Sequence, residues 1–111
     1  MNAAGTINVF YLIAAAALGV VAIPLVLRLI KPNSWYGFRT PHMQTNPELW
    51  YTTNVTAGSG CLLTAVITLV VILAASLVNA ASAEIMAFLL TLILPGGILL
   101  TLFYTWRKYR A

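Results

Sequence analysis

The chain has 111 residues, of which 61% are hydrophobic and only 7% are charged, and its net charge is +4. In soluble domains about a quarter of the residues are charged. This composition therefore excludes an ordinary soluble protein and indicates a single integral membrane domain. The basic residues form two small clusters, Arg28, Lys31 and Arg39, and Arg107, Lys108 and Arg110. Neither cluster is large enough to follow a phosphate backbone, which argues against nucleic-acid binding.

The first apolar segment, residues 9–27, contains no charged side chain. At about 1.5 Å per residue it is long enough to cross a hydrocarbon core of about 30 Å. Positive charge follows this segment instead of preceding it, unlike in a cleaved signal peptide. A first transmembrane helix over about residues 7–30 is therefore predicted, and the small residues Ala15, Gly19 and Ala22 on one face predict close packing against another helix.

Two further apolar segments, residues 55–78 and 85–106, are also uncharged. They predict transmembrane helices over about residues 47–78 and 84–106, joined by a connection short enough to make the two helices antiparallel neighbours. The predicted fold class is thus an all-α integral membrane protein, in which residues 1–111 form one domain with three transmembrane helices.

Small and hydroxyl side chains share one face of the second predicted helix, at the spacing of helical turns. They are Ala57, Gly60, Thr64 and Thr68. Such a stripe allows a second helix to approach closely and to form hydrogen bonds. The alternative is a polar conduction path, although such a path usually contains an acidic residue at depth and this helix contains none.

The loop between the first two helices, residues 31–46, concentrates polar and aromatic side chains. Aromatic rings suit the headgroup level of a membrane, and the loop contains Trp35, Tyr36 and Phe38. Gly37 permits a tight turn. Arg39 has a planar guanidinium that can hold a carboxylate, a phosphate or a row of backbone carbonyls, and Thr40-Pro41 predicts an extended dipeptide after it.

The second helix has a clear predicted start, with Asn46 as its N-cap, Pro47 at the first position and Glu48 in the first turn. Glu48 is also placed to pair with Arg39 across the turn. One face of this helix then presents three residues one turn apart, Trp50, Asn54 and Gly58.

These residues resemble the signature of the SdpI/YfhL family of small bacterial membrane proteins. The matching positions are Asn33, Trp35, Tyr36, Gly37, Phe38, Arg39, Thr40, Pro41, Asn46, Trp50, Asn54 and Gly58. The resemblance implies resistance to a membrane-active peptide toxin, with signalling through a cytoplasmic regulator as a related role. We therefore predict a non-enzymatic protein of the bacterial inner membrane that binds a hydrophobic peptide or a protein partner.

The orientation in the membrane follows from the distribution of charge. Three spans place the loop of residues 31–46 and the C-terminus on one side, and both carry basic residues, whereas the other side carries Glu84. The positive-inside rule then predicts an external N-terminus, with the loop and the C-terminus in the cytoplasm.

Other interpretations remain open from the sequence. The loop signature can be purely structural, with Arg39 capping helix ends and Trp35 and Trp50 anchoring at the headgroups. The chain can also be an oligomeric transporter or channel subunit, whose path follows the threonine stripe and a kink at Pro95, or a membrane enzyme that acts on lipid headgroups through Arg39 and His42.

The sequence predicts no cofactor and no metal site, because it contains no cluster of Cys, His and carboxylate ligands. Membrane lipid is the general partner of such a chain. Self-association is also predicted, because three helices bury little apolar surface.

Overall fold

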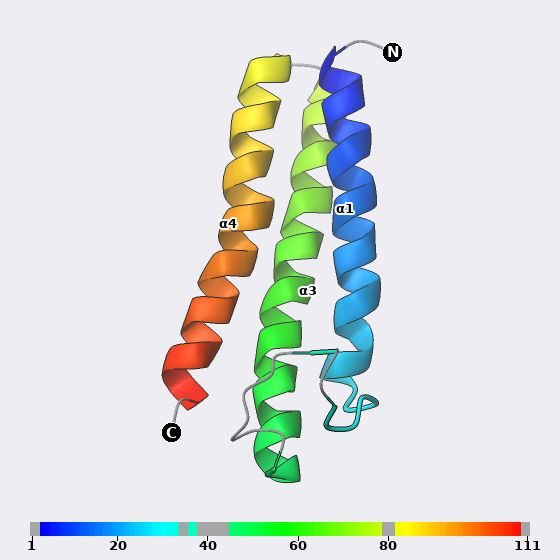
Figure 1. Cartoon of the computed structure of the whole chain (residues 1–111). Helices are drawn as coiled ribbons and strands as arrows, with labels where there is room; N and C mark the ends of the chain where they lie inside the picture. Colours follow the sequence, from blue (N-terminus) through cyan, green and yellow to red (C-terminus); the bar gives the residue numbers. More distant parts are fainter. Residues whose placement is uncertain (1–2, 34–35, 38–44, 79–81, 110–111) are drawn as a thin grey trace.

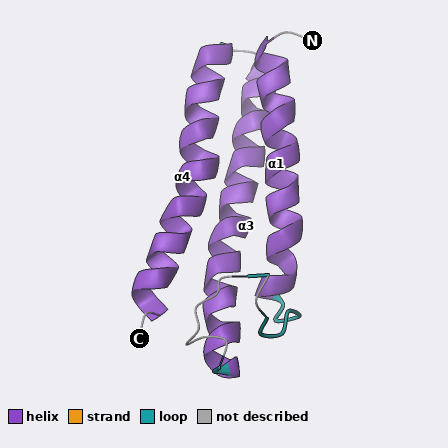
Figure 2. Cartoon of the chain, in the orientation of Figure 1, coloured by secondary structure: helices purple, strands orange, loops and turns teal. Residues whose placement is uncertain are grey.

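The computed structural model of the chain describes residues 3–33, 36–37, 45–78 and 82–109. The regular structure in these ranges consists of three helices: α1 (Ala3–Val26), α3 (Pro47–Val78) and α4 (Ala83–Tyr109). Each helix contains a segment long and apolar enough to cross a membrane. The predicted all-helical architecture with three spans is therefore confirmed, and Figure 2 shows that the described regular structure is helical throughout.

The three helices lie side by side, and each of them packs against both others (Figure 1). The end of α1, the start of α3 and the end of α4 lie at one end of the bundle, which we call the loop end. The N-terminus of α1 and the start of α4 lie at the opposite end (Figure 1). The described part of the loop and the basic last turn of α4 are therefore at the same end.

A Schellman turn ends α1 at Val26, before the boundary near residue 30 that the sequence indicated. The amide of Leu29 donates to the carbonyl of Pro24 at 2.9 Å, and the amide of Arg28 donates to the carbonyl of Leu25 at 3.3 Å. Arg28 adopts φ 61° at the position that glycine usually occupies in this motif. These bonds satisfy carbonyls that the end of the helix leaves open.

The start of α3 is capped as the sequence predicted. The Asn46 side chain accepts a hydrogen bond from the amide of Leu49 at 3.2 Å, and the Asn46 carbonyl accepts one from the amide of Trp50 at 2.9 Å. With 32 residues, α3 has a length of about 48 Å and exceeds a hydrocarbon core of about 30 Å. At the loop end, its first turns extend beyond the ends of α1 and α4 (Figure 1).

The predicted stripe on α3 is a packing surface for α4. A side chain at Gly60 would collide with Thr101, and one at Gly97 would come within 2.6 Å of the Thr64 methyl group. The Thr64 and Thr68 hydroxyls donate to carbonyls of their own helix, those of Gly60 and Thr64, at 2.8 Å each. The stripe therefore serves close helix packing, which was the first of its two interpretations.

The small residues of α1 also pack as predicted. Ala15 and Ala22 are buried, and the Cβ position of Gly19 lies 3.8 Å from the Ala65 Cβ on α3. Many large apolar side chains elsewhere remain exposed, including Phe10 and Leu77. Such an outer surface suits contact with lipid. The core of the bundle combines small residues such as Ala65 with large ones such as Met86 and Leu90.

Candidate functional site

Five signature residues meet at the loop end of the bundle, where α1 stops and α3 begins. We call them the loop brace: Asn33, Tyr36, Gly37, Trp50 and Asn54. Three of them follow α1, and two belong to α3. Together they attach the chain on both sides of residues 38–44 to the ends of the helices.

The first part of the brace is a turn built on Asn33. Its amide nitrogen donates to the Lys31 carbonyl at 2.7 Å, while its Oδ1 accepts a hydrogen bond from the amide of Tyr36 at 2.6 Å. This double use of an asparagine side chain mimics a backbone turn. The Tyr36 hydroxyl then donates to the Val21 carbonyl at 2.6 Å, so the turn is held against α1.

The second part is Trp50, whose side chain is fully buried. Its indole nitrogen donates to the carbonyl of Ile30 at 2.9 Å. Since Ile30 lies beyond the end of α1, its carbonyl has no helical partner at hand and the indole supplies one. The structure thus places Trp50 inside the protein, where it joins α3 to the loop, whereas the structural interpretation of the sequence had placed it among the headgroups.

The third part is the contact between Asn54 and Gly37. Asn54 is 2% exposed, and its amide nitrogen donates to the Trp50 carbonyl at 3.0 Å. Gly37 has φ 100°, and a Cβ at this position would lie 2.7 Å from the Asn54 Oδ1. Both the backbone conformation and the available space therefore require glycine at this position.

Gly58 lies one turn beyond Asn54 and lets α1 approach α3. A Cβ at Gly58 would lie 3.1 Å from the Leu25 Cβ, 3.1 Å from a Val26 methyl group and 3.2 Å from the Ala22 carbonyl oxygen. The signature face of α3 is therefore a contact face for the end of α1, and Gly58 leaves little room there for a side chain.

The remaining loop residues of the signature lie outside the described ranges. They are Trp35, Phe38, Arg39, Thr40 and Pro41, together with His42. The predicted pair between Glu48 and Arg39 also depends on a residue outside these ranges. Glu48 itself lies in the first turn of α3 and is exposed.

Two polar features near this site were not anticipated from the sequence. The Thr56 hydroxyl donates to the Thr52 carbonyl at 3.2 Å, so the Tyr109 hydroxyl, 2.8 Å away, is the donor to Thr56 and joins the end of α4 to α3. In addition, the hydroxyl oxygen of buried Thr53 has no hydrogen-bond partner within the described part of the chain. A tyrosine at the end of a transmembrane segment usually indicates the membrane interface. The contact of Tyr109 with α3 was therefore not expected from the sequence.

The polar atoms of the brace are used to hold backbone. Asn33, Tyr36, Trp50 and Asn54 all donate to main-chain carbonyls. Among the described residues, no group of three or more His, Cys, Asp or Glu side chains gathers where it could hold a metal ion. The brace is therefore suited to positioning a loop.

The fold and this site define a helical membrane protein with three spans and a braced loop after the first of them. The sequence model of the SdpI/YfhL protein family matches residues 29–105, which is more than half of the chain and includes the whole brace. The chain belongs to the SdpI/YfhL protein family. Comparisons with curated proteins and with solved structures found no match.

Proposed function

We propose that this protein is a non-enzymatic immunity or signalling protein of the bacterial inner membrane, with an external N-terminus and a cytoplasmic loop and C-terminus. In this proposal, the loop of residues 31–46 binds a hydrophobic peptide toxin or a protein partner. Membership of the SdpI/YfhL family and the positive charge of the loop end support it.

The observation that carries the proposal is the loop brace. Trp50 and Asn54 are buried, and their side chains hold the backbone of the loop end and of α3. Supporting residues of this kind pre-organise a recognition segment and so lower the entropy that binding must overcome. We therefore assign Trp50, Asn54 and Gly37 to positioning and Arg39 to contact with the partner.

The transporter alternative receives less support. The hydroxyls of Thr64 and Thr68 donate within their own helix, and α4 packs directly against Gly60. A conduction path along this stripe would first have to separate α3 from α4.

Growth at graded toxin dose tests the proposal in a bacterium that is sensitive to membrane-active peptides. We expect expression of the protein to raise survival against at least one hydrophobic peptide. Arg39→Lys should lose this protection nearly as fully as Arg39→Ala, because lysine supplies a point charge without the planar fork. Arg28→Lys is the matched control and should retain protection, since Arg28 lies outside the signature.

Membrane levels of each variant, measured by immunoblot, separate loss of function from loss of protein. Flux of small solutes into liposomes that contain the purified protein provides the competing measurement. Absence of protection across a broad peptide panel, combined with selective flux, would replace the immunity proposal with the channel alternative.

A further inference from the structure

A groove runs along α3 and α4 from the middle of the membrane span to the last turn of α4. Three adjoining cavities with volumes of about 420, 470 and 620 Å³ form it. All three are lined by Leu100, the first two share Tyr104, and the last two share Gly60, Leu63 and Thr101. They are therefore sections of one continuous surface, which we call the α3–α4 groove.

The part of the groove within the membrane is apolar. Its walls include Leu63, Ile67 and Leu92. Gly96 leaves the surface open, because a Cβ at this position would meet no atom within 4 Å. The Thr64 hydroxyl donates to the Gly60 carbonyl, so its proton is not available to an occupant.

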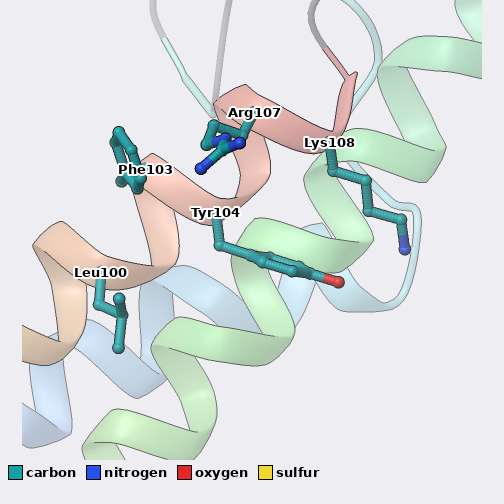
Figure 3. Close-up of a pocket in the computed structure, with 5 residues that line it drawn as sticks. All are labelled: Leu100, Phe103, Tyr104, Arg107 and Lys108. Carbon is teal, nitrogen blue, oxygen red and sulfur yellow. The ribbon is translucent and has the colours of Figure 1, made fainter.

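The other end of the groove is basic and aromatic, with Leu100, Phe103, Tyr104, Arg107 and Lys108 around it. The Arg107 guanidinium lies 5.9 Å from the centre of the Phe103 ring, and the Lys108 ammonium lies 5.8 Å from that of Tyr104. Figure 3 shows Arg107 pointing towards Phe103 and the ammonium of Lys108 ending near Tyr104. Within the described ranges, neither cation forms an ion pair with a carboxylate.

The length of the groove matches one leaflet of a bilayer. From Gly96 to Arg107, α4 rises by about 17 Å, which is close to half of a hydrocarbon core of about 30 Å. An occupant that fits both ends therefore needs an apolar chain one leaflet long and an anionic group at the headgroup level. A second copy of this protein, packed in parallel on the same face, would instead bring Arg107 and Lys108 against like charges.

We propose that the α3–α4 groove binds one anionic phospholipid from the leaflet around the C-terminal end of α4. The lipid phosphate lies near Tyr104, with the Arg107 and Lys108 side chains on either side of it (Figure 3). An acyl chain follows Leu100 and Leu63 to the open surface at Gly96. This inference rests on α3 and α4 alone and does not depend on the immunity proposal.

Native mass spectrometry of the purified full chain tests the basic end. The protein is mixed with equal amounts of phosphatidylglycerol and phosphatidylcholine that carry the same acyl chains. We expect one phosphatidylglycerol to be retained with a preference of roughly tenfold, because basic side chains at the membrane surface attract anionic lipid. The double variant Arg107→Gln/Lys108→Gln should bind the two lipids about equally.

The matched control is Arg28→Gln/Lys31→Gln, which removes two positive charges at the same end of the bundle but outside the groove. This control should keep the preference for phosphatidylglycerol. An equal loss of preference in both double variants would overturn the proposal, because general surface charge would then explain the effect.

The apolar end is tested with Gly96→Leu, because a Cβ at this position meets no atom of the bundle within 4 Å. We expect the retention of both lipids to fall severalfold, whereas Ala17→Leu, at an exposed position of α1, should leave it unchanged. Unchanged retention with Gly96→Leu would overturn the proposal. If that variant does not accumulate, the double variants decide the question without it.

The same spectra identify other occupants. Displacement of the lipid by inorganic phosphate alone would overturn the groove as an acyl-chain site, so we expect the lipid to remain bound. A lipid-free dimer that is lost with Gly96→Leu would also overturn the proposal, because a second copy would then cover the groove.

Discussion

Left-handed backbone occurs at two residues of the described ranges, Gly37 at φ 100° and Arg28 at φ 61°. At Gly37, the close approach of the Asn54 side chain also excludes a larger residue. Arg28 is exposed and ends α1 in a position that glycine adopts with less strain. Both residues therefore have a positive φ. Gly37 adopts it without a side chain, whereas Arg28 adopts it with one and is strained.

Arg28→Gly should therefore stabilise the protein. Relief of left-handed strain, about 1–2 kcal/mol, is partly offset by the greater entropy of glycine in the unfolded chain, so we expect a net gain of about 0.5–1 kcal/mol. Thermal unfolding in detergent micelles measures it. Gly37→Ala, the matched control, should lower stability, and a less stable Arg28→Gly variant would show that the lost charge outweighs the strain.

The burial of Trp50 and Asn54 also changes how substitutions at the signature should be interpreted. The Trp50 indole holds the Ile30 carbonyl and the Asn54 side chain lies against Gly37, so their replacement acts on the loop through its attachment to α3. Loss of protection in such variants would therefore show that the replaced residue positions the loop. Variants of Arg39 test contact with the partner.

At the scale of the helices, the adjacent glycines of α4 differ in their surroundings. Gly97 faces Thr64, whose side chain would lie within 2.6 Å of a Cβ, whereas Gly96 faces open surface. Thr64 is buried and its hydroxyl is bonded to Gly60, so it has little freedom to move aside. The contact between α3 and α4 therefore depends on Gly97 and not on Gly96.

Substitution of each glycine by alanine tests this difference. Gly97→Ala should lower stability by about 1–3 kcal/mol through overpacking. Gly96→Ala, its matched control, should leave stability unchanged or raise it by up to about 1 kcal/mol, because alanine is the better helix former. Unfolding of the two variants in the same detergent compares them directly, and equal effects would contradict the described packing of α3 on α4.

At the scale of the whole molecule, the basic last turn of α4 lies at the same end as the loop (Figure 1). The positive-inside rule predicts a cytoplasmic location for this end. Such a placement would expose the loop of residues 31–46 to a cytoplasmic regulator. It would also direct the basic end of the α3–α4 groove to the inner leaflet.

Cysteine labelling measures this orientation. In a Cys61→Ser background, a cysteine introduced by Gln44→Cys should react with an impermeant maleimide only after the cells are opened. A cysteine introduced by Ala81→Cys should react in intact cells, because it belongs to the connection at the opposite end. Labelling of position 44 from outside would show that the protein has the opposite orientation.

Much of the architecture was predictable because lipid restricts the choices of the chain. Backbone groups within a membrane must be satisfied internally, so long uncharged segments become helices. The N-cap at Asn46 and the packing of small residues at Ala15 and Ala22 were also predictable, because capping residues and small-residue stripes can be recognised from the local sequence. The site was only partly predictable, since the signature identified Trp50 and Asn54 without their partners.

The sequence by itself determined the number of spans, the all-helical class and the place of the signature, because hydropathy and helix capping depend on neighbouring residues. Only the tertiary structure decided that α1 ends in a Schellman turn at Arg28, that Trp50 is buried against the loop end, and that Gly97 rather than Gly96 contacts α3. The Schellman turn is local, but it lacks the glycine that usually marks it in a sequence. The burial of Trp50 and the contact of Gly97 depend on residues distant in the chain, and local patterns carry no information about which side chain faces which neighbour.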